Sequence, residues 1–465
     1  MDIDVNIKLF SIRRKIVLGK EWIRFGVVSL VVLATLVLAY WGSSRIMILF
    51  LALLGAVAGV PFLLKQPNLG IILIIVGGML VPYSGPAGVN MAVFAVALST
   101  GVWLMNMLVI QKEFIFIRSQ AFLPIMVMLV ISVIAFGMGQ IPWFVFANQA
   151  PLDAQVGGFA IFILSLGCTL VTAHLVQDIR WLKTIVWIYI GLSAIYVFGR
   201  LVGLPVGRYY QIGLVSGSMF WTWLVVLAFA QAFFNNKLKL PVRNLLYGVV
   251  LITMYVAYVR GNDWKSGWVP AAVAIAVMIG LRYKRLVLLA IPIALIAMGN
   301  LVVQLIASDE YSWGTRIDAW QIVFEISKVN PLFGLGFSNY YWYTPLFPIR
   351  GWNVTFNSHS QFLDLIAQTG FLGLIAFFWL FFVFGRLAWR LSKQLPDGFS
   401  RAYIYGMIAG IAAIMVAAFL GDWILPFVYN VGLNGFRSSI LTWIFLGGVV
   451  CIEQLVLNGN ISQDG

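Results

Sequence analysis

The chain has 465 residues, of which 62% are hydrophobic and only 10% are charged, and its mean hydropathy is +0.97. Soluble domains are about 45–50% apolar and about 25% charged, so this composition excludes a soluble globular protein. A net charge of +14 on a soluble protein would suggest nucleic acid as a partner. In a membrane protein it first reflects the enrichment of Lys and Arg in cytoplasmic loops, so no nucleic acid partner is expected.

Apolar stretches long enough to cross a hydrocarbon core of about 30 Å recur along the whole chain. We therefore expect an all-α polytopic membrane protein with about 14 (12–14) transmembrane helices and one long outer loop that carries an amphipathic helix. No small-residue cleavage site follows the first apolar run, so we keep that run as a span. The expected spans are residues 22–41, 45–64, 67–83, 88–110, 121–139, 156–176, 182–199, 214–234, 244–259, 267–281, 286–306, 360–385, 402–420 and 437–457.

These spans divide the chain into three parts of one integrated membrane domain. Residues 1–306 hold the N-terminal transmembrane helices, residues 307–359 form the long loop, and residues 360–465 hold the C-terminal helices. With both termini placed in the cytoplasm, most Lys and Arg residues fall on the cytoplasmic side, as the positive-inside rule requires. The cations left outside are Arg45, Arg200, Arg208, Arg260, Lys265, Arg316, Lys328, Arg350 and Arg437.

Common cofactor signatures are missing from the sequence. It contains no phosphate-binding Walker loop, no zinc-spaced His/Cys cluster and no G-x-S-x-G nucleophile elbow, so neither a cofactor nor a metal is expected. The two cysteines, Cys168 and Cys451, fall within apolar spans, where packing is the expected role and a disulfide framework is excluded.

The long loop contains a candidate anion site. Thr315 to Asp318 has the form of a capping box, and Ile317, Trp320 and Phe324 recur at helical spacing until Asn330-Pro331 stops the pattern. We expect an amphipathic helix over 316–328 with Arg316 in its first turn, where backbone N–H groups and a guanidinium favour an anion. The alternative is an Arg316 that snorkels to the membrane interface or pairs with Asp318.

The loop ends on a second candidate. Ser358 and Gln361 also fit a capping box, which would put His359 at the first helical position of the next span. The positive end of a helix disfavours an imidazolium ion, so His359 should stay neutral and able to accept a proton. His359 is also the only histidine expected outside the membrane. A histidine with a purely structural role is the alternative.

These residues belong to a larger pattern that resembles the O-antigen ligase and Wzy-like O-antigen polymerase superfamily, with an R-x-x-x-W helix, a P-L-x-G-x-G turn and an H-[NS]-x-[YF]-L…G-x-x-G-L start of a span. Ser360 stands where the superfamily commonly has Asn, and about twelve spans are usual there. The matching residues are Arg316, Trp320, Asn330-Pro331-Leu332-Phe333-Gly334-Leu335-Gly336, His359-Ser360-Gln361-Phe362-Leu363 and Gly370-Phe371-Leu372-Gly373-Leu374.

The resemblance implies a glycosyltransferase of the bacterial inner membrane whose active site faces the periplasm. Such enzymes move a glycan from undecaprenyl diphosphate to an acceptor, either a lipid A core or another glycan. The resemblance makes His359 the base and Arg316 a catalytic cation. Diphosphate contacts would come from Arg208, Arg260, Lys265 and Arg200 on neighbouring outer loops. Asp364 and Trp320 would support the site, with Asp263 and Asp422 as weaker candidates. The other outer cations are assigned to phospholipid contacts.

Ligase and polymerase share donor chemistry, so the sequence does not separate them, and a protein O-oligosaccharyltransferase is a third member of this class. The rival from another class is a polysaccharide flippase or exporter. Transporters that couple to ions need ionisable residues near the membrane midplane, and these are nearly absent from the expected spans. A polar path between two repeated halves would favour transport.

Overall fold

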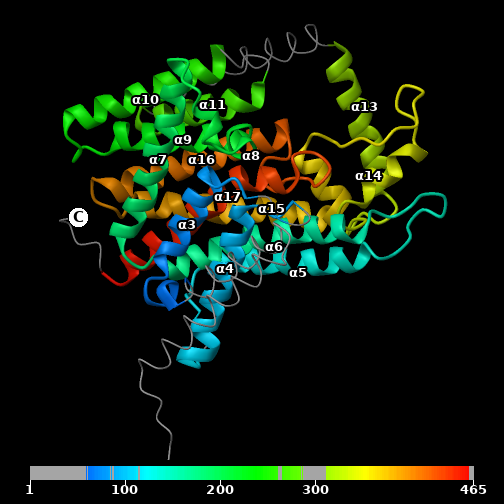
Figure 1. The fold of residues 1–465 in the computed structure, drawn as a ribbon, viewed down its shortest axis with the longest axis horizontal. Helices are drawn as coiled ribbons and strands as arrows, with labels where there is room; N and C mark the ends of the chain where they lie inside the picture. Colours follow the sequence, from blue (N-terminus) through cyan, green and yellow to red (C-terminus); the bar gives the residue numbers. More distant parts are fainter. Residues whose placement is uncertain are drawn as a thin grey trace, which may run out of the picture. The chain divides into compact units, whose positions relative to one another are not determined.

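The computed structural model describes residues 59, 61–83, 85, 88–113, 116–259, 264–283, 285 and 310–459. The chain forms two compact units, residues 1–65 and 66–465, and only the second is described in detail. Its described part is helical, with one isolated β-bridge between Ile349 and Trp352. The protein is therefore an all-α polytopic membrane protein (Figure 1).

Eight of the described helices are long and apolar enough to cross a membrane, and three shorter apolar helices accompany them. Together they correspond to eleven of the expected spans; 22–41 and 286–306 lie outside the described residues, as does most of 45–64. The long helices are α4 (Met91–Met105, continued by the π-helix η2, Asn106–Gln111), α6 (Leu152–Leu175), α7 (Ile179–Leu201), α10 (Leu240–Val259), α11 (Lys265–Arg282), α15 (Gln361–Ser392), α16 (Phe399–Leu420) and α17 (Gly432–Leu457). The shorter ones are α3 (Asn68–Leu80), α5 (Phe122–Met138) and α9 (Ser218–Phe234).

The centre of this unit is α17, which lies in the middle of the described helices in Figure 1. It packs against α6, α9 and the short helix α8 (Ile212–Val215), and 83% of its most apolar stretch is buried within the protein. The corresponding share for α10 is only 28%, because α10 packs mainly on α9 and turns its other faces outward. A helix that is apolar all round is expected in both settings, buried in a bundle or facing lipid.

Arg437, expected at a phospholipid interface, is instead buried inside α17. Its guanidinium donates to the backbone oxygens of Gly78, Val81 and Tyr83, at and beyond the end of α3. Those carbonyls have no partner within the helix, and a cation near a helix C-terminus is favourable. Arg437 is therefore a capping residue, and the expected lipid contact is wrong.

The helix α15 is broken at Gly370, and the broken turn is completed by the loop that precedes it in the chain. Gly370 has φ 71°, so the backbone bonds of a regular helix are lost there. The N–H groups of Leu335 and Gly336 donate to the carbonyls of Ala367 and Gln368 at 2.8 and 3.2 Å. In return, the N–H group of Phe371 donates to Pro331 at 2.8 Å. The two glycine-containing motifs of the sequence thus bind each other.

The remaining elements of the long loop lie beside this break. They are α13 (Glu310–Ser327), α14 (Asn339–Tyr343) and the 3-10 turn η4 (Thr344–Leu346), and α13 packs against α15 and α14. The expected helix 316–328 is confirmed, but it begins earlier, at Glu310. Its buried side is formed by Ala319, Val323 and Ile326, whereas Ile317 and Phe324 are exposed.

Candidate functional site

One cavity of about 490 Å³ brings together the two residues on which the sequence analysis placed catalysis. Its wall comes from α13, from the loop that follows η4, and from the turn before α15. Arg316 and His359, which lie 43 positions apart, both line it. The other lining residues are Thr315, Ala319, Ile349, Arg350, Trp352, Val354, Phe356 and Asn357.

His359 occupies a left-handed turn immediately before α15. Its φ is 48°, a conformation that is uncommon for a residue with a side chain, although His is among the residues that adopt it more often. The backbone N–H of His359 donates to Oδ1 of Asn357 at 3.1 Å. The N–H of Ser360 donates to Oγ of Ser358 at 3.0 Å, so both polar neighbours hold the turn. His359 as a whole residue is exposed, and it lines the cavity.

The expected capping box at Ser358 and Gln361 is wrong. The helix begins at Gln361 with Ser360 as its N-cap, so His359 precedes the helix instead of occupying its first position. The side chain of Gln361 is engaged elsewhere, because Oε1 accepts from the N–H groups of Ile424 and Leu425 at 3.2 and 2.8 Å. Gln361 therefore anchors the start of α15 to the loop between α16 and α17.

Arg316 lies in the second turn of α13, not in the first turn as expected. Thr315 and Asp318 are consequently inside the helix and do not cap it, because the helix already starts at Glu310. Arg316 therefore does not lie beside the free N–H groups of the helix start, and these groups do not contribute to anion binding at Arg316. What places its guanidinium at the cavity is the face of α13 on which it lies, next to Ala319.

Arg350 lines the same cavity, although it was not among the expected site residues. Its Nε donates to Oδ2 of Asp318 at 2.8 Å, so the ion pair that was considered for Arg316 is made by Arg350. Arg350 has φ 51°, and its guanidinium lies over Gly314 of α13. No local pattern in the sequence could have found it, since its partner is 32 residues away.

The electrostatic setting of His359 favours a neutral imidazole. The cavity walls partly desolvate the ring, and this burial is the larger cause that lowers the pKa of His359 below 6.5; the positive charge of Arg316 lowers the pKa further. The expected direction holds, but the cause is the cavity and its arginine instead of a helix dipole. A neutral imidazole beside two guanidinium groups can accept a proton while anionic groups bind nearby.

Beneath the turn lies a buried polar network centred on Asp364, which is only 1% exposed. Its Oδ1 accepts from the hydroxyl of Tyr340 at 2.5 Å and from Oγ of Ser358 at 2.7 Å. Tyr340 Oη accepts in turn from the N–H of Ser358 at 3.2 Å. Burial and the charge of Asp364 raise the pKa of Tyr340, so its hydroxyl remains a donor. Asp364 thus supports the turn that carries His359 without touching the cavity.

Two further residues complete this support. Trp320 Nε1 donates to the backbone oxygen of Ser358 at 2.7 Å, which ties α13 directly to the turn. Asp422 is buried and accepts from the N–H of Phe427 and from Asn430 at 2.7 and 2.5 Å. Burial raises the pKa of Asp422, and its charge acts on Tyr340. Trp320 therefore holds the turn of His359 against α13, whereas Asp422 holds the loop that follows α16.

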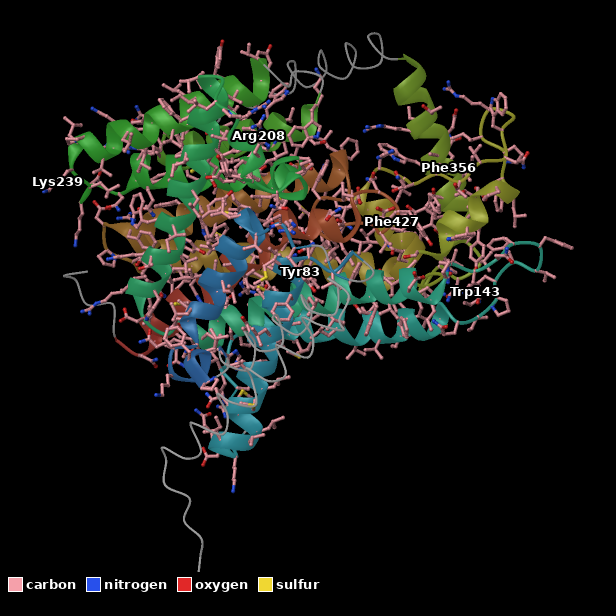
Figure 2. All side chains as sticks on the ribbon, viewed as in Figure 1. Tyr83, Trp143, Arg208, Lys239, Phe356 and Phe427 are labelled. Carbon is pink, nitrogen blue, oxygen red and sulfur yellow. The ribbon has the colours of Figure 1, made fainter. Side chains whose placement is uncertain are left out.

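Of the remaining expected diphosphate ligands, the three that the structure describes, Arg200, Arg208 and Lys265, do not line this cavity. Arg200 lies in the last turn of α7, Arg208 ends the 3-10 turn η3 (Val206–Arg208), and Lys265 begins α11. In Figure 2 Arg208 lies well away from Phe356, a residue of the cavity wall. Arg260 and Asp263 lie outside the described residues. The assignment of these four cations to the diphosphate therefore stays a prediction.

Of the other outer cations, Lys328 has a partner of its own. Lys328 Nζ lies 2.5 Å from Oε1 of Glu325, an exposed ion pair at the end of α13. Arg45 falls outside the described residues. Of the nine cations that the sequence placed outside, the described structure therefore brings Arg316 and Arg350 to the cavity of His359.

Part of the chain matches a known protein family. No curated protein matches the chain. A family model described as O-antigen ligase matches residues 212–378, a range that runs from α8 through the kink of α15. The range contains Arg316, Arg350 and His359, as well as the paired glycine motifs. Residues 212–378 of this membrane protein are thus similar to the O-antigen ligase family, as the resemblance in the sequence implied.

Proposed function

We propose that this protein transfers a glycan from a lipid-linked diphosphate carrier, undecaprenyl diphosphate, to an acceptor at the cavity of Arg316, Arg350 and His359. The observation that carries the proposal is that one neutral histidine and two arginines, brought from three separate segments, line a single cavity within the range that is similar to the O-antigen ligase family. We further propose that this cavity faces the periplasm and that the protein resides in a bacterial inner membrane.

The reaction is a single displacement at the anomeric carbon of the donor sugar. The acceptor hydroxyl forms the new C–O bond while His359 takes up its proton. The bond from the anomeric carbon to the diphosphate breaks, and the lipid diphosphate leaves with the bonding electron pair. Arg316 and Arg350 stabilise the negative charge that develops on it, since guanidinium groups bind phosphate oxygens in a bidentate manner.

The part of the cavity wall formed by Trp352, Val354 and Phe356 suits a carbohydrate. Trp352 is 71% exposed and Val354 is 45% exposed, and both line the cavity with Phe356. An exposed aromatic ring offers an apolar face for a sugar ring, and amphipathic side chains of this kind also suit a membrane interface. The donor glycan would lie on this wall with its diphosphate toward Arg316.

The acceptor decides between the three activities of this class. A lipid A core acceptor makes the protein a ligase, another lipid-linked repeat makes it a polymerase, and a hydroxyl of a protein side chain makes it an O-oligosaccharyltransferase. Incubation of the purified protein with lipid-linked repeat units, with and without lipid A core, separates them by the length and attachment of the product.

The test of the site is His359→Ala in the same assay. A general base accelerates a reaction by about 10²–10⁴-fold, so the rate of glycan transfer should fall by about that factor while the protein remains folded and inserted. His174→Gln is the matched control, because His174 is buried in α6 and its Nε2 accepts from the N–H of Ile117, a bond that a Gln oxygen can also accept.

Full activity of His359→Ala would overturn the assignment of the base. A protein that moves lipid-linked glycan across vesicles without forming a new glycosidic bond would be a flippase or exporter instead, and the proposed reaction would be wrong.

A further inference from the structure

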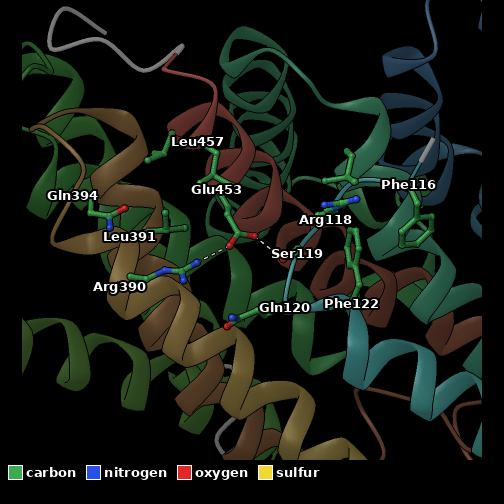
Figure 3. A pocket seen from close by; sticks show the side chains of 12 residues that line it. Phe116, Arg118, Ser119, Gln120, Phe122, Arg390, Leu391, Gln394, Glu453 and Leu457 are labelled. Atoms are coloured by element: carbon green, nitrogen blue, oxygen red, sulfur yellow. Dashed lines mark hydrogen bonds and ion pairs between the residues drawn. The ribbon is translucent and has the colours of Figure 1, made fainter.

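A second polar site lies at the opposite end of α15 from His359. A cavity of about 750 Å³ is formed by the segment before α5 and by the ends of α15 and α17 (Figure 3). A neighbouring cavity of about 390 Å³ extends along α15. Gln120 and Arg390 line both cavities, so the two form one groove.

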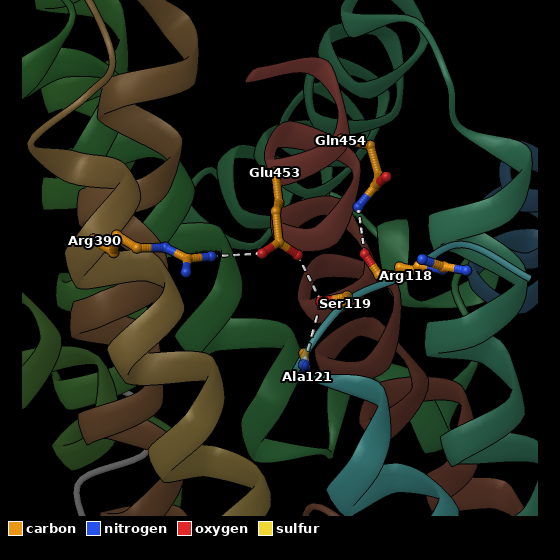
Figure 4. Close-up of polar contacts among 6 residues, drawn as sticks. All are labelled: Arg118, Ser119, Ala121, Arg390, Glu453 and Gln454. Atoms are coloured by element: carbon orange, nitrogen blue, oxygen red, sulfur yellow. Dashed lines mark hydrogen bonds and ion pairs between the residues drawn. The ribbon is translucent and has the colours of Figure 1, made fainter. Parts of the chain in front are cut away.

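The groove is rich in guanidinium groups. Arg118 lines the larger cavity, Arg386 the smaller one and Arg390 both. Arg390 pairs with Glu453 at 2.6 Å, and the other carboxylate oxygen of Glu453 accepts from Ser119 Oγ at 2.6 Å (Figure 4). In the described part of the chain, Arg118 and Arg386 are exposed and make no ion pair.

The polarity of the groove changes along α15. Trp379 and Val383 come first, followed by Arg386 and then by Arg390, all on one side of the helix at spacings of three or four residues. From Trp379 to Arg390 the helix rises by roughly 17 Å, about half of a 30 Å hydrocarbon core. Leu123 at the start of α5, 59% exposed, adds to the apolar wall.

A molecule that matches this groove has an anionic head of phosphate size and an apolar chain about one leaflet long. We propose that the groove is a binding site for an anionic phospholipid of the adjacent leaflet. Its phosphate lies by Arg386 and Arg390, with Arg118 across the mouth, and an acyl chain follows Val383, Trp379 and Leu123. The carboxylate of Glu453 is already held by Arg390 and Ser119, so it is neutralised within the wall.

The test measures binding of phosphatidylglycerol to the purified full chain by native mass spectrometry and by titration in detergent. The double variant Arg118→Gln/Arg386→Gln removes two cations and leaves the Arg390–Glu453 pair in place. At about 1 kcal/mol for each cation near an anionic lipid, binding should weaken by about 30-fold. Arg180→Gln/Arg401→Gln, which removes two cations that do not line the groove, should bind as the parent does.

A second variant tests the chain-binding part without changing the charge. Val383→Trp fills the groove beside Trp379 and should also lower retention of phosphatidylglycerol, whereas the water-soluble headgroup glycerophosphoglycerol should not compete. Equal losses in both double variants would show a general charge effect and overturn the site. Binding of the soluble headgroup or of inorganic phosphate as tight as that of the lipid would overturn the lipid assignment.

Discussion

At the scale of single residues, the site depends on a histidine held in an unusual backbone conformation. His359 has φ 48°, and the side chains of Asn357 and Ser358 and the indole of Trp320 bind the backbone around it. Conformations of this kind persist only where the surrounding contacts enforce them, and they are frequent at active sites. As a result, His359 precedes α15 and its side chain lies at the cavity wall.

The first prediction concerns the pH dependence of transfer. The pKa of His359 is lowered, so the neutral base is present at pH 7 and transfer should decline only as the pH falls below 6.5. Arg316→Gln removes a charge that lowers this pKa and should move the acidic limb to higher pH, besides reducing kcat by about 10²–10³-fold.

Arg316→Lys keeps the positive charge and should leave the acidic limb in place, although a Lys lacks the bidentate geometry of Arg. The measurement is kcat and kcat/KM against pH for the three proteins. An acidic limb that does not move in Arg316→Gln would show that His359 is not the titrating base.

The second prediction concerns Tyr340. Tyr340→Phe leaves the N–H of Ser358 and one oxygen of Asp364 without their hydroxyl partner, which should cost about 1–3 kcal/mol of stability and lower kcat as the turn of His359 loosens. Tyr403→Phe is the matched control, because that buried hydroxyl donates to Phe445 in the bundle at 2.6 Å.

Thermal unfolding in detergent and transfer should be measured for both variants. The stability of both should fall, but only Tyr340→Phe should lose turnover beyond what the loss of folded protein explains. If the two lose turnover equally, the network under the turn has no positioning role.

At the scale of elements, the break in α15 explains why the two glycine motifs occur together. A helix of 32 residues would run regularly through the membrane, but Gly370 interrupts it and the loop 331–336 supplies the missing hydrogen bonds. A Cβ at Gly370 would lie 2.1 Å from the carbonyl oxygen of Leu332, so both the conformation and the space require glycine. This joint fixes α13 and the turn of His359 relative to the span.

The third prediction follows from this joint. Gly370→Ala should destabilise the protein by about 1–3 kcal/mol and reduce transfer, because the loop 331–336 must move away. Gly385→Ala in the same helix is the control: its nearest contact would be Ile411 at 3.9 Å, so it should be neutral or stabilising by up to about 1 kcal/mol. Unfolding temperature and transfer rate check both, and equal behaviour would contradict the role of the joint.

For α13 the local sequence pattern predicted the helix correctly, but it did not predict which face of the helix is buried against protein. The spacing of Ile317, Trp320 and Phe324 correctly indicated a helix, yet the side buried against protein carries Ala319, Val323 and Ile326. In a protein surrounded by lipid, large apolar side chains are stable on the outside, so hydrophobicity does not mark the buried face.

At the scale of the whole molecule, the sequence predicts an orientation that can be tested by labelling. Cys168 and Cys451 are both buried, so the parent protein should react little with a membrane-impermeant maleimide. Asn353→Cys, in the exposed part of the loop, should be labelled in intact spheroplasts, whereas Gln394→Cys at the other end of α15 should react only after permeabilisation. The reverse pattern would place the cavity of His359 in the cytoplasm.

The sequence by itself determined the class of the molecule, the positions of most spans and the helix in the long loop, and it predicted Arg316 and His359 as site residues. Composition and hydropathy suffice for the spans because a backbone in lipid must satisfy its hydrogen bonds internally, which leaves the helix as the form for each apolar stretch of this length. The motifs suffice for the resemblance to the O-antigen ligase family because each motif joins residues that lie close in the chain.

Only the tertiary structure decided which cations meet at the site. Arg350 reaches the cavity through an ion pair with a residue 32 positions away, Arg437 turns inward to cap α3, and Arg208 lies at another part of the bundle. The structure also replaced two expected capping boxes by long-range contacts, of Asp318 with Arg350 and of Gln361 with Ile424. The local sequence is compatible with several partners for each side chain, and the packing of segments distant in the chain determines which partner is bound.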